Sequence, residues 1–369
     1  MLDSSAYDRY SSDPLVHPNP SLGSLEKAPF LVSPTNVARR SSAAVDDGCM
    51  VTAVRPLDLE NAATIASAFD LGPVDAFDGP IARGQLGQVF RLTTETGRWA
   101  VKQPFHPQAE DDAMQDAALT IAARTAGVPT PDARLTNSGA VLLELPGTQA
   151  RVHEWVDLAE PDPGLDPEEI GVAVAALHRM PYRTSRGQHP WYRAPIGVAR
   201  WDELIAALSA ADAPFASDLA GLRDELVALE RWLADPADLR VCHRDLFPEN
   251  LRGTGGGGVC IIDWDGHGLA GASQELAHVV WAFACGSADR AGRITRAYRD
   301  AGGPGRISGP GDFTMIIASL GHINERACTR WLESPAGDPE RDRMASLFGE
   351  AVADPLTRAV VTDLLDAVG

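Results

Sequence analysis

One stretch of the sequence decides how the chain is interpreted: residues 243–250 are His-Arg-Asp-Leu-Phe-Pro-Glu-Asn. The stretch follows a short apolar run, and Pro248 within it disfavours a helix. Asp245 and Asn250 are therefore expected on one loop that can turn both side chains into the same cleft. A second apolar run follows and ends at Asp263.

These three polar side chains match the needs of phosphoryl transfer, which requires a positioned nucleotide, a bound cation and a carboxylate beside the attacking hydroxyl. Asp245 is the candidate for that carboxylate, and Asn250 and Asp263 offer the hard oxygen ligands that Mg²⁺ prefers. Taken singly, Asp245 would be interpreted as a turn acid and Asn250 as a helix cap. Their joint order, with an aspartate ending the next strand, favours a kinase-type site that uses ATP and Mg²⁺.

Phosphate contacts are predicted upstream, in a segment with strand patterns. Gly84 and Gly87 flank a tight turn between two strands, where backbone amides can approach phosphates without an intervening side chain. Lys102 ends a later strand, and alternation places it on the same face as Ala100. A lysine there can hold nucleotide phosphates as a compact positive charge, and a surface strand lysine is the alternative.

The two residues before Asp245 are assigned differently. His243 is expected to pack and to hydrogen-bond the loop backbone rather than to act as a catalytic base. Arg244 can pair with an acid or contact a phosphate, and the sequence leaves both options open.

Hydrophobic periodicity separates a strand-rich part from a helical part. Asp58 can cap a short helix, strands are expected from about residue 77 to residue 156, and one helix over residues 109–126 interrupts them. Beyond it, helices are expected from Asp166 and over residues 201–210, 216–234, 273–300, 311–333 and 339–366. A strand pair is expected around residues 239–242 and 259–262, with the glycines at 255–258 as the tip between them.

We therefore predict an α+β chain with two lobes. Residues 51–156 would form a small N-terminal antiparallel β-sheet lobe with one helix, ending in the segment that joins the lobes. Residues 157–369 would form a larger, mostly helical C-terminal lobe that carries the catalytic loop and the substrate site.

Residues 1–50 differ from the rest of the chain. They contain nine serines and five prolines and show no helical or strand period, which is the composition of a disordered tail. Met50 is an alternative translation start, and N-terminal sequencing of the natural product would test it.

Composition restricts the partners. A net charge of −19 disfavours nucleic acid and anionic membrane surfaces, and it suits a cationic substrate as well as simple solubility. The five cysteines show no metal or redox spacing, so reduced and mostly buried thiols are expected. No apolar run reaches the length of a membrane span and no secretory signal is visible, so we expect a cytoplasmic protein.

Several segments together resemble the aminoglycoside phosphotransferase family, which has a protein-kinase-like fold. The segments are residues 84–89, 101–102, 243–250 and 262–265. The resemblance covers residues 77–285 and is most specific at 241–265. It implies that residues 151–156 join the two lobes and that the backbone at Glu154 and Val156 holds the adenine of the nucleotide.

The sequence departs from the family at three positions. Glu275 replaces the aspartate that usually follows the metal-binding strand, and Arg244 stands where a glycine is common. The family also has a glutamate that pairs with the nucleotide lysine. Asp116 occupies its expected position, and Glu110 is the weaker candidate. Because aspartate is shorter by one methylene, the pair with Lys102 is expected to be looser or bridged by water.

The resemblance implies an ATP-dependent phosphotransferase that acts on a hydroxyl of a small molecule. An aminoglycoside-like antibiotic, an amine-bearing metabolite, and a sugar, choline or homoserine are all compatible with the sequence. Four acids could form an amine-binding pocket, although ordinary surface or capping roles are favoured for them: Asp265, Glu275, Glu325 and Glu333. The sequence gives no oligomeric state.

Two other classes compete with this interpretation. A weakly active nucleotide-binding pseudokinase is favoured by Asp116 and disfavoured by the intact Asp245, Asn250 and Lys102. A protein-serine kinase is disfavoured because no Ala-Pro-Glu segment follows Asp263.

Overall fold

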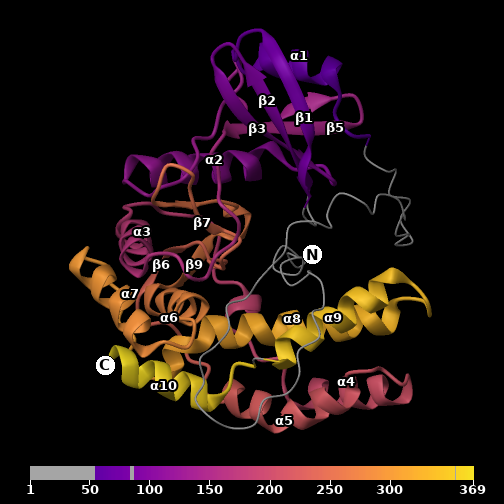
Figure 1. The fold of residues 1–369 in the computed structure, drawn as a ribbon, viewed down its shortest axis with the longest axis vertical. Helices are drawn as coiled ribbons and strands as arrows, with labels where there is room; N and C mark the ends of the chain where they lie inside the picture. Colours follow the sequence, from indigo (N-terminus) through magenta and orange to yellow (C-terminus); the bar gives the residue numbers. More distant parts are fainter. Residues whose placement is uncertain (1–54, 84–86, 354) are drawn as a thin grey trace.

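The computed structural model describes residues 55–83, 87–353 and 355–369. Figure 1 shows a sheet-containing lobe above a larger helical lobe, as the α+β, two-lobed prediction expected. The predictions for the tail at 1–50, for the start at Met50 and for Gly84 fall outside the described residues. The boundary between residues 156 and 157 stays a prediction.

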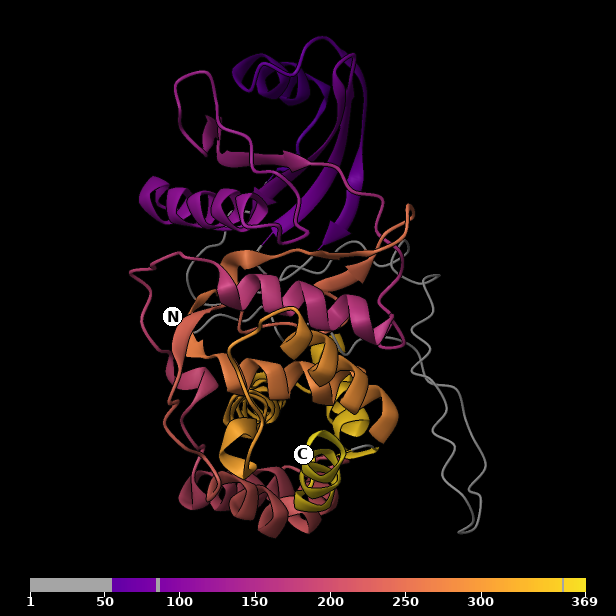
Figure 2. The same cartoon turned by 90° about the vertical axis from the view of Figure 1, so that its left-hand side faces the viewer.

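The upper lobe is built on one antiparallel sheet in the order β1-β2-β3-β5-β4. Its strands are β1 (Val74–Arg83), β2 (Gly87–Thr94), β3 (Gly97–Pro104), β4 (Leu143–Leu145) and β5 (Thr148–Glu154). Two helices accompany the sheet, α1 (Leu59–Ala68), which Asp58 caps, and α2 (Glu110–Thr125). Figures 1 and 2 show α2 between the sheet and the helical lobe, so one of its faces borders the space between the lobes.

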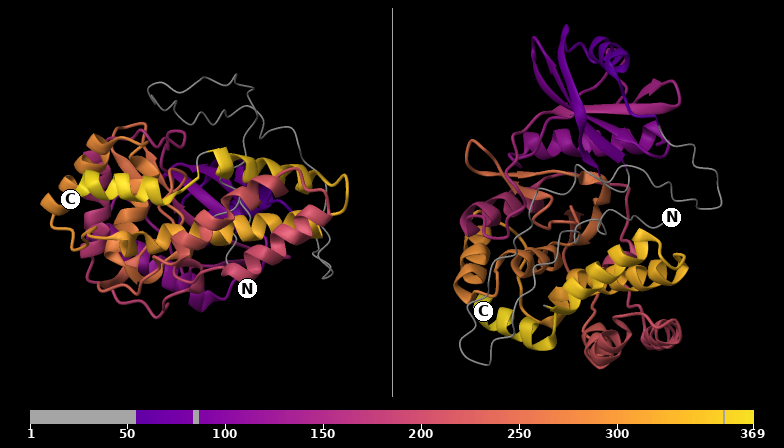
Figure 3. Two further views of the ribbon diagram at one scale, coloured as in Figure 1. Left: turned by 90° about the horizontal axis from the view of Figure 1, so that it is seen from below. Right: turned by 45° about the vertical axis from the view of Figure 1, so that its right-hand side comes forward.

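The lower lobe contains eight α-helices among the described residues. They are α3 (Pro167–Arg179), α4 (Val198–Ala210), α5 (Ala216–Glu230), α6 (Ala272–Phe283), α7 (Ala288–Asp300), α8 (Thr314–Glu333), α9 (Pro339–Ala353) and α10 (Arg358–Val368). Figure 3 shows α4 and α5 side by side at the end of the molecule farthest from the sheet. No helix within the described ranges is long and apolar enough to cross a membrane.

Four short strands in this lobe correct the predicted strand pair. β6 (Leu239–Cys242) pairs with β9 (Gly268–Gly271), and β7 (Leu251–Gly253) pairs with β8 (Val259–Ile261). The glycine tip therefore closes the β7–β8 hairpin and does not join β6 to β8. The three residues of β7 are too few to show an alternation in the sequence, so their pairing was missed.

Two predicted long helices are each divided in two. The first breaks between α6 and α7, where Cys285 and Gly286 have left-handed φ values of 51° and 68° and Ser287 caps α7. The second breaks between α9 and α10, after Pro355, where the side chain of Thr357 accepts a hydrogen bond from the amide of Val360. In both cases local backbone and capping chemistry outweighs a continuous apolar period.

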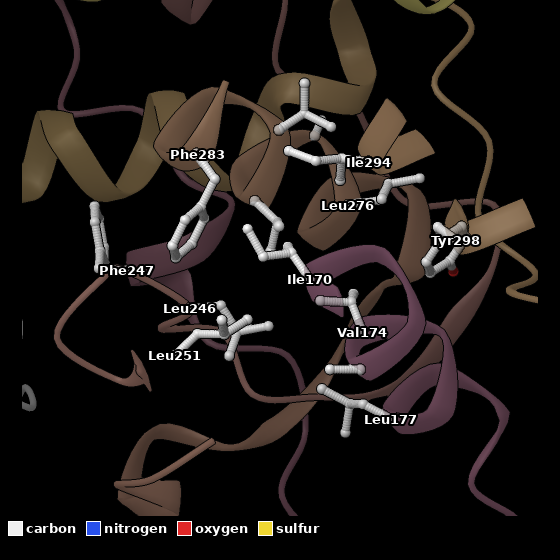
Figure 4. Close-up of a cluster of buried hydrophobic side chains, with 14 of the residues drawn as sticks. Ile170, Val174, Leu177, Leu246, Phe247, Leu251, Leu276, Phe283, Ile294 and Tyr298 are labelled. Carbon is white, nitrogen blue, oxygen red and sulfur yellow. The ribbon is translucent and has the colours of Figure 1, made fainter. Parts of the chain in front are cut away.

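Residues 243–250, called the catalytic loop here after the role predicted for them, are anchored in the main hydrophobic core. Figure 4 shows Leu246, Phe247 and Leu251 packed near residues of α3 such as Ile170 and Val174. All five side chains are almost completely buried. Full burial of one such side chain contributes about 1.5–3 kcal/mol, so the polar residues between them are placed on a rigid base.

The described cysteines agree with the expectation of mostly buried thiols. Cys242, Cys260 and Cys328 are buried, Cys285 is exposed, and none forms a disulfide in the described part of the chain.

Two helical glycines provide a test of the packing. A Cβ at Gly171 would lie 2.5 Å from the carbonyl oxygen of Ile294 and 2.8 Å from the Cβ of Ala297, because α3 and α7 are in close contact there. Gly171→Ala should therefore lower the free energy of unfolding by about 1–3 kcal/mol, measured by urea denaturation. The matched control is Gly221→Ala in α5, where the added Cβ meets nothing within 4 Å. It should be neutral or stabilise by up to about 1 kcal/mol, and equal effects of the two changes would contradict this account.

Candidate active site

The catalytic loop brings Asp245 and Asn250 together, as the sequence predicted. Both residues are buried, and the side-chain amide of Asn250 donates to the backbone oxygen of Asp245 at 2.9 Å and to its Oδ2 at 3.0 Å. The amide nitrogen is thus committed to the loop. The carbonyl oxygen Oδ1 of Asn250 can therefore coordinate a cation or accept a hydrogen bond from a donor.

The β7–β8 hairpin joins Asn250 to Asp263. The backbone oxygen of Asn250 accepts a hydrogen bond from the amide of Ile262 at 2.8 Å. Asp263 follows with a left-handed φ of 61°, which turns its side chain out of the strand direction. His243 Nε2 lies 2.9 Å from the oxygen of Ile262 and its ring packs on Trp264. This is the packing and hydrogen-bonding role expected for His243.

Lys102 on β3 faces two aspartates of the helical lobe. Its Nζ lies 2.6 Å from Asp265 Oδ2 and 3.2 Å from Asp263 Oδ1. Burial favours a lower pKa for Lys102, but the two carboxylates outweigh burial and raise the pKa above its usual value. The ammonium group is therefore charged at neutral pH.

Asp116, for which the sequence predicted a looser or water-bridged pair with Lys102, makes its direct ion pairs with arginines. Among the described residues, its ion pairs with arginine are to Arg186 at 2.8 Å and to Arg151 at 3.4 Å, and none is to Lys102. The shorter aspartate on α2 is instead surrounded by these longer guanidinium groups. Burial, and next the nearby carboxylate of Asp265, raise the pKa of Asp116 to about 7, which the two arginines offset only in part.

Asp265 forms the centre of this ionic cluster. Its Oδ1 accepts from Arg151 at 2.6 Å while its Oδ2 accepts from Lys102. Burial would raise the pKa of Asp265, but Arg151 and Lys102 together hold it well below its usual value. Sequence patterns did not single out Arg151 or Arg186, because only the strand register and the loop path bring them here.

A buried carboxylate supports the catalytic loop from behind. Glu275, at the start of α6, accepts hydrogen bonds from the backbone amides of His243, at 3.2 Å, and of Arg244. Its Oε2 also lies 2.8 Å from His178 Nε2, and the other ring nitrogen of His178 lies 2.7 Å from the hydroxyl of Tyr298. Burial favours a higher pKa for Glu275, yet these hydrogen bonds, that of His178 above all, lower it.

Arg244 is used inside the fold. Its guanidinium donates to the backbone oxygens of Gly266 at 2.7 Å, His267 at 2.7 Å and Gly187 at 3.1 Å, and it lies over the ring of Tyr192. Within the described ranges no acid pairs with this guanidinium, and a phosphate contact of Arg244 stays a prediction. The side chain ties the loop after α3 to the turn after Asp263.

A cleft of about 470 Å³ opens beside this cluster. It is lined by Pro107, Gln108, Ala109, Asp112, Ala113, Asp116, Arg186, His189, Trp191, Tyr192, Arg244, Asp265 and Gly266. It therefore lies between α2 and the loop that follows α3. Its lining combines aromatic rings with charges of both signs.

The acidic pocket considered from the sequence does not assemble. Asp265 belongs to the ionic cluster and Glu275 is buried behind the catalytic loop. Glu325 pairs with Arg200, and Glu333 is exposed at the end of α8. Their ordinary structural or surface roles prevail.

The remaining predicted residues, Gly87, Glu154 and Val156, belong to the sheet lobe and to the segment that leaves it. Gly87 begins β2, and an added Cβ there would lie 2.5 Å from the carbonyl oxygen of Gln103, so a close strand approach already requires this glycine. Glu154 ends β5 and its carboxylate pairs with Arg124, while Val156 follows in the connecting segment. Adenine binding by Glu154 and Val156, and phosphate binding by Gly87, stay predictions.

The fold and the site together define a kinase-like protein, with a sheet lobe that supplies a lysine and a helical lobe that supplies an aspartate–asparagine loop. The sequence model of the phosphotransferase enzyme family matches residues 79–309, and the chain belongs to this family. The family resemblance predicted from the motifs is confirmed. No curated protein matches the chain by sequence.

Solved structures share the fold at low sequence identity. An aminoglycoside phosphotransferase from Alicyclobacillus acidocaldarius is similar with a TM-score of 0.57 and 19% identity, over 89% of this chain and 97% of that chain. Spectinomycin phosphotransferase in complex with ADP and spectinomycin gives 0.59 and 14%, over 85% and 99%. An amicoumacin kinase in complex with AMP-PNP and Ca²⁺ gives 0.53 and 15%, over 79% and 91%.

Replacing Glu275 tests the support of the catalytic loop. Glu275→Ala removes the acceptor of three buried donors, so we expect the free energy of unfolding at pH 7 to fall by about 3–5 kcal/mol in urea denaturation. The lowered pKa of Glu275 means that its stabilisation is present above the unfolded-state pKa and is lost as pH falls through the folded-state pKa. The difference from the wild type should therefore shrink in acid.

The exposed Glu333→Gln serves as the control and should change stability by less than about 0.5 kcal/mol at every pH. A Glu275→Ala protein as stable as this control would show that the loop does not depend on the carboxylate.

Proposed function

We propose that this protein transfers the γ-phosphate of ATP to a hydroxyl group of a small molecule. The observation that carries the proposal is the convergence of Asp245, Asn250, Asp263 and Lys102, from two lobes of a phosphotransferase-family chain. The contact of Asn250 with Asp245 and that of Lys102 with Asp263 are connected by the backbone hydrogen bond between Ile262 and Asn250.

Asp245 would act on the acceptor. Its carboxylate accepts a hydrogen bond from the acceptor hydroxyl and takes the proton as that oxygen bonds to the γ-phosphorus. The bond between the γ-phosphorus and the bridging oxygen breaks at the same time, and ADP leaves with the electron pair. The buried hydrogen bond from Asn250 fixes the orientation of the Asp245 carboxylate for this step.

The donor set fits a divalent cation such as Mg²⁺. Asn250 has its amide nitrogen committed to Asp245, so its carbonyl oxygen and the carboxylate of Asp263 are two hard oxygen ligands that the described residues can provide. When bound, the cation would neutralise phosphate charge. The cationic Lys102 would contact the phosphates from the sheet lobe.

The nucleotide would lie against the segment that joins the lobes. Under this proposal the backbone of Glu154 and Val156 holds adenine, and the backbone amides at Gly84 and Gly87 contact the phosphates. Trp155 supports this geometry, because its amide donates to the oxygen of Arg98 and so fixes the segment to β3.

The acceptor would enter the cleft between α2 and the loop after α3. The cleft offers Trp191 and Tyr192 as aromatic surfaces and Asp112 as an acid at its edge, features compatible with a hydroxylated amine. An aminoglycoside-like antibiotic and an amine-bearing metabolite are the leading acceptor classes. A sugar, choline or homoserine is the alternative. We place the reaction in the cytoplasm, because free and mostly buried cysteines are typical of that reducing compartment.

A weakly active nucleotide-binding protein is the second candidate function. The observation that favours it is the absence, in the described residues, of the expected ion pair between Lys102 and Asp116. Wild-type ATP consumption on a panel of aminoglycosides, other antibiotics, choline, homoserine and sugars separates the two functions. Turnover with at least one acceptor supports the enzyme, and tight ATP binding with no turnover supports the second candidate.

The Asp245→Asn variant tests the catalytic role. It keeps the size of the side chain but removes the base, so kcat should fall by about 10²- to 10⁴-fold in a coupled ADP-release assay. ATP binding, measured by calorimetry, should change little, because Asp245 is assigned to the acceptor. An Asp245→Asn protein with wild-type kcat would exclude the proposed mechanism.

A further inference from the structure

The ionic cluster points to a different partner for the nucleotide lysine than the one in related proteins. We propose that Asp265 is the residue that positions Lys102, and that Arg151 braces Asp265 against Asp116 on α2. This inference rests on the proposed function, in which Lys102 contacts the phosphates of ATP.

The distances favour Asp265 over Asp263. The Nζ of Lys102 is 2.6 Å from Asp265 and 3.2 Å from Asp263, and the Asp265 side chain is 12% exposed against 34% for Asp263. A shorter contact that is better shielded from water is the stronger electrostatic interaction. Asp263 is also the proposed cation ligand, so it cannot be the dedicated partner of the lysine.

The strand register places a second basic side chain, that of Arg151, beside Lys102. Lys102 and Arg151 are directly opposite in the antiparallel β3–β5 pair, so both side chains leave the same face of the sheet. Two adjacent positive charges would repel each other. Asp265 lies between them and gives one carboxylate oxygen to each, which fixes the carboxylate in a single orientation.

Asp116 is held by ion pairs with two arginines of the same ionic cluster. Its carboxylate pairs with Arg151 on one oxygen and with Arg186 on the other, and Arg186 also donates to the backbone oxygen of Asp265 at 3.1 Å. Among the described residues, the direct ion pairs that connect Asp116 on α2 with Lys102 run through Arg151 and Asp265. The carboxylate that orients the lysine comes from the helical lobe, two residues after the proposed cation ligand.

Nucleotide binding tests this assignment without knowledge of the acceptor. The dissociation constant of ATP would be measured by calorimetry on the full chain, with MgCl₂ present, for wild type, Asp265→Asn and Asp116→Asn. We expect Asp265→Asn to weaken ATP binding about tenfold or more, and Asp116→Asn to weaken it less. Asp111→Asn, an exposed aspartate on the same helix as Asp116, is the control that should leave binding unchanged.

Three further measurements separate positioning from other roles. ADP binding in EDTA removes any contribution of a cation, and the loss in Asp265→Asn should persist there. In a Lys102→Ala background, Asp265→Asn should have little further effect, because the group that it positions is gone. Asp265→Glu keeps the negative charge and should recover most of the binding, which distinguishes positioning from a folding defect.

The outcomes are distinct. An Asp116→Asn protein that loses as much affinity as Asp265→Asn, or a loss in Asp265→Asn that disappears in EDTA, would overturn the assignment. An additive effect in the Lys102→Ala background would overturn it as well. If the wild type binds neither ATP nor ADP, the proposed function falls and this inference falls with it.

Discussion

The contact on which the site depends most is the one between the Glu275 carboxylate and the two backbone amides at the start of the catalytic loop. Arg244 has a φ of 68°, a left-handed conformation that a non-glycine residue adopts only when its surroundings compensate. Glu275 accepts hydrogen bonds from His243 and Arg244 at this turn. The carboxylate therefore holds the backbone that aims Asp245, although it never reaches the cleft itself.

The side chain of Arg244 also stabilises the segments around that strained turn. Its guanidinium fills the space beside Gly268, where an added Cβ would lie only 2.5 Å from Arg244 Cζ. Of the three residues whose backbone oxygens accept from it, Gly266 and His267 are buried, so the guanidinium supplies hydrogen-bond donors to buried carbonyls. Burial lowers the pKa of Arg244 from its usual value. A guanidinium keeps its proton inside proteins, so the side chain acts as a cationic brace.

Much of this architecture was accessible from the sequence, for identifiable reasons. Asp245, Asn250 and Asp263 could be assigned together because they are close in the chain and follow the apolar runs at 239–242 and 259–262. The pairing of β6 with β9 and the ionic partners of Asp116 could not, because they depend on which distant segments meet. Arg151 illustrates the difference: its residue type is unremarkable in a strand, and only the register opposite Lys102 gives it a role.

Motion between the lobes would affect the two halves of the site differently, because the β7–β8 hairpin lies within the helical lobe. Asn250 and Asp263 are joined across this hairpin by a backbone hydrogen bond, so their spacing is set within the helical lobe alone. Lys102 and Arg151 belong to the sheet and would move with it. Hinge opening would thus leave the two proposed cation ligands as a preformed pair while drawing the two basic groups away. An open molecule would still present the two proposed cation ligands to a divalent ion. Only a closed molecule would bring the basic groups of the sheet lobe to the triphosphate.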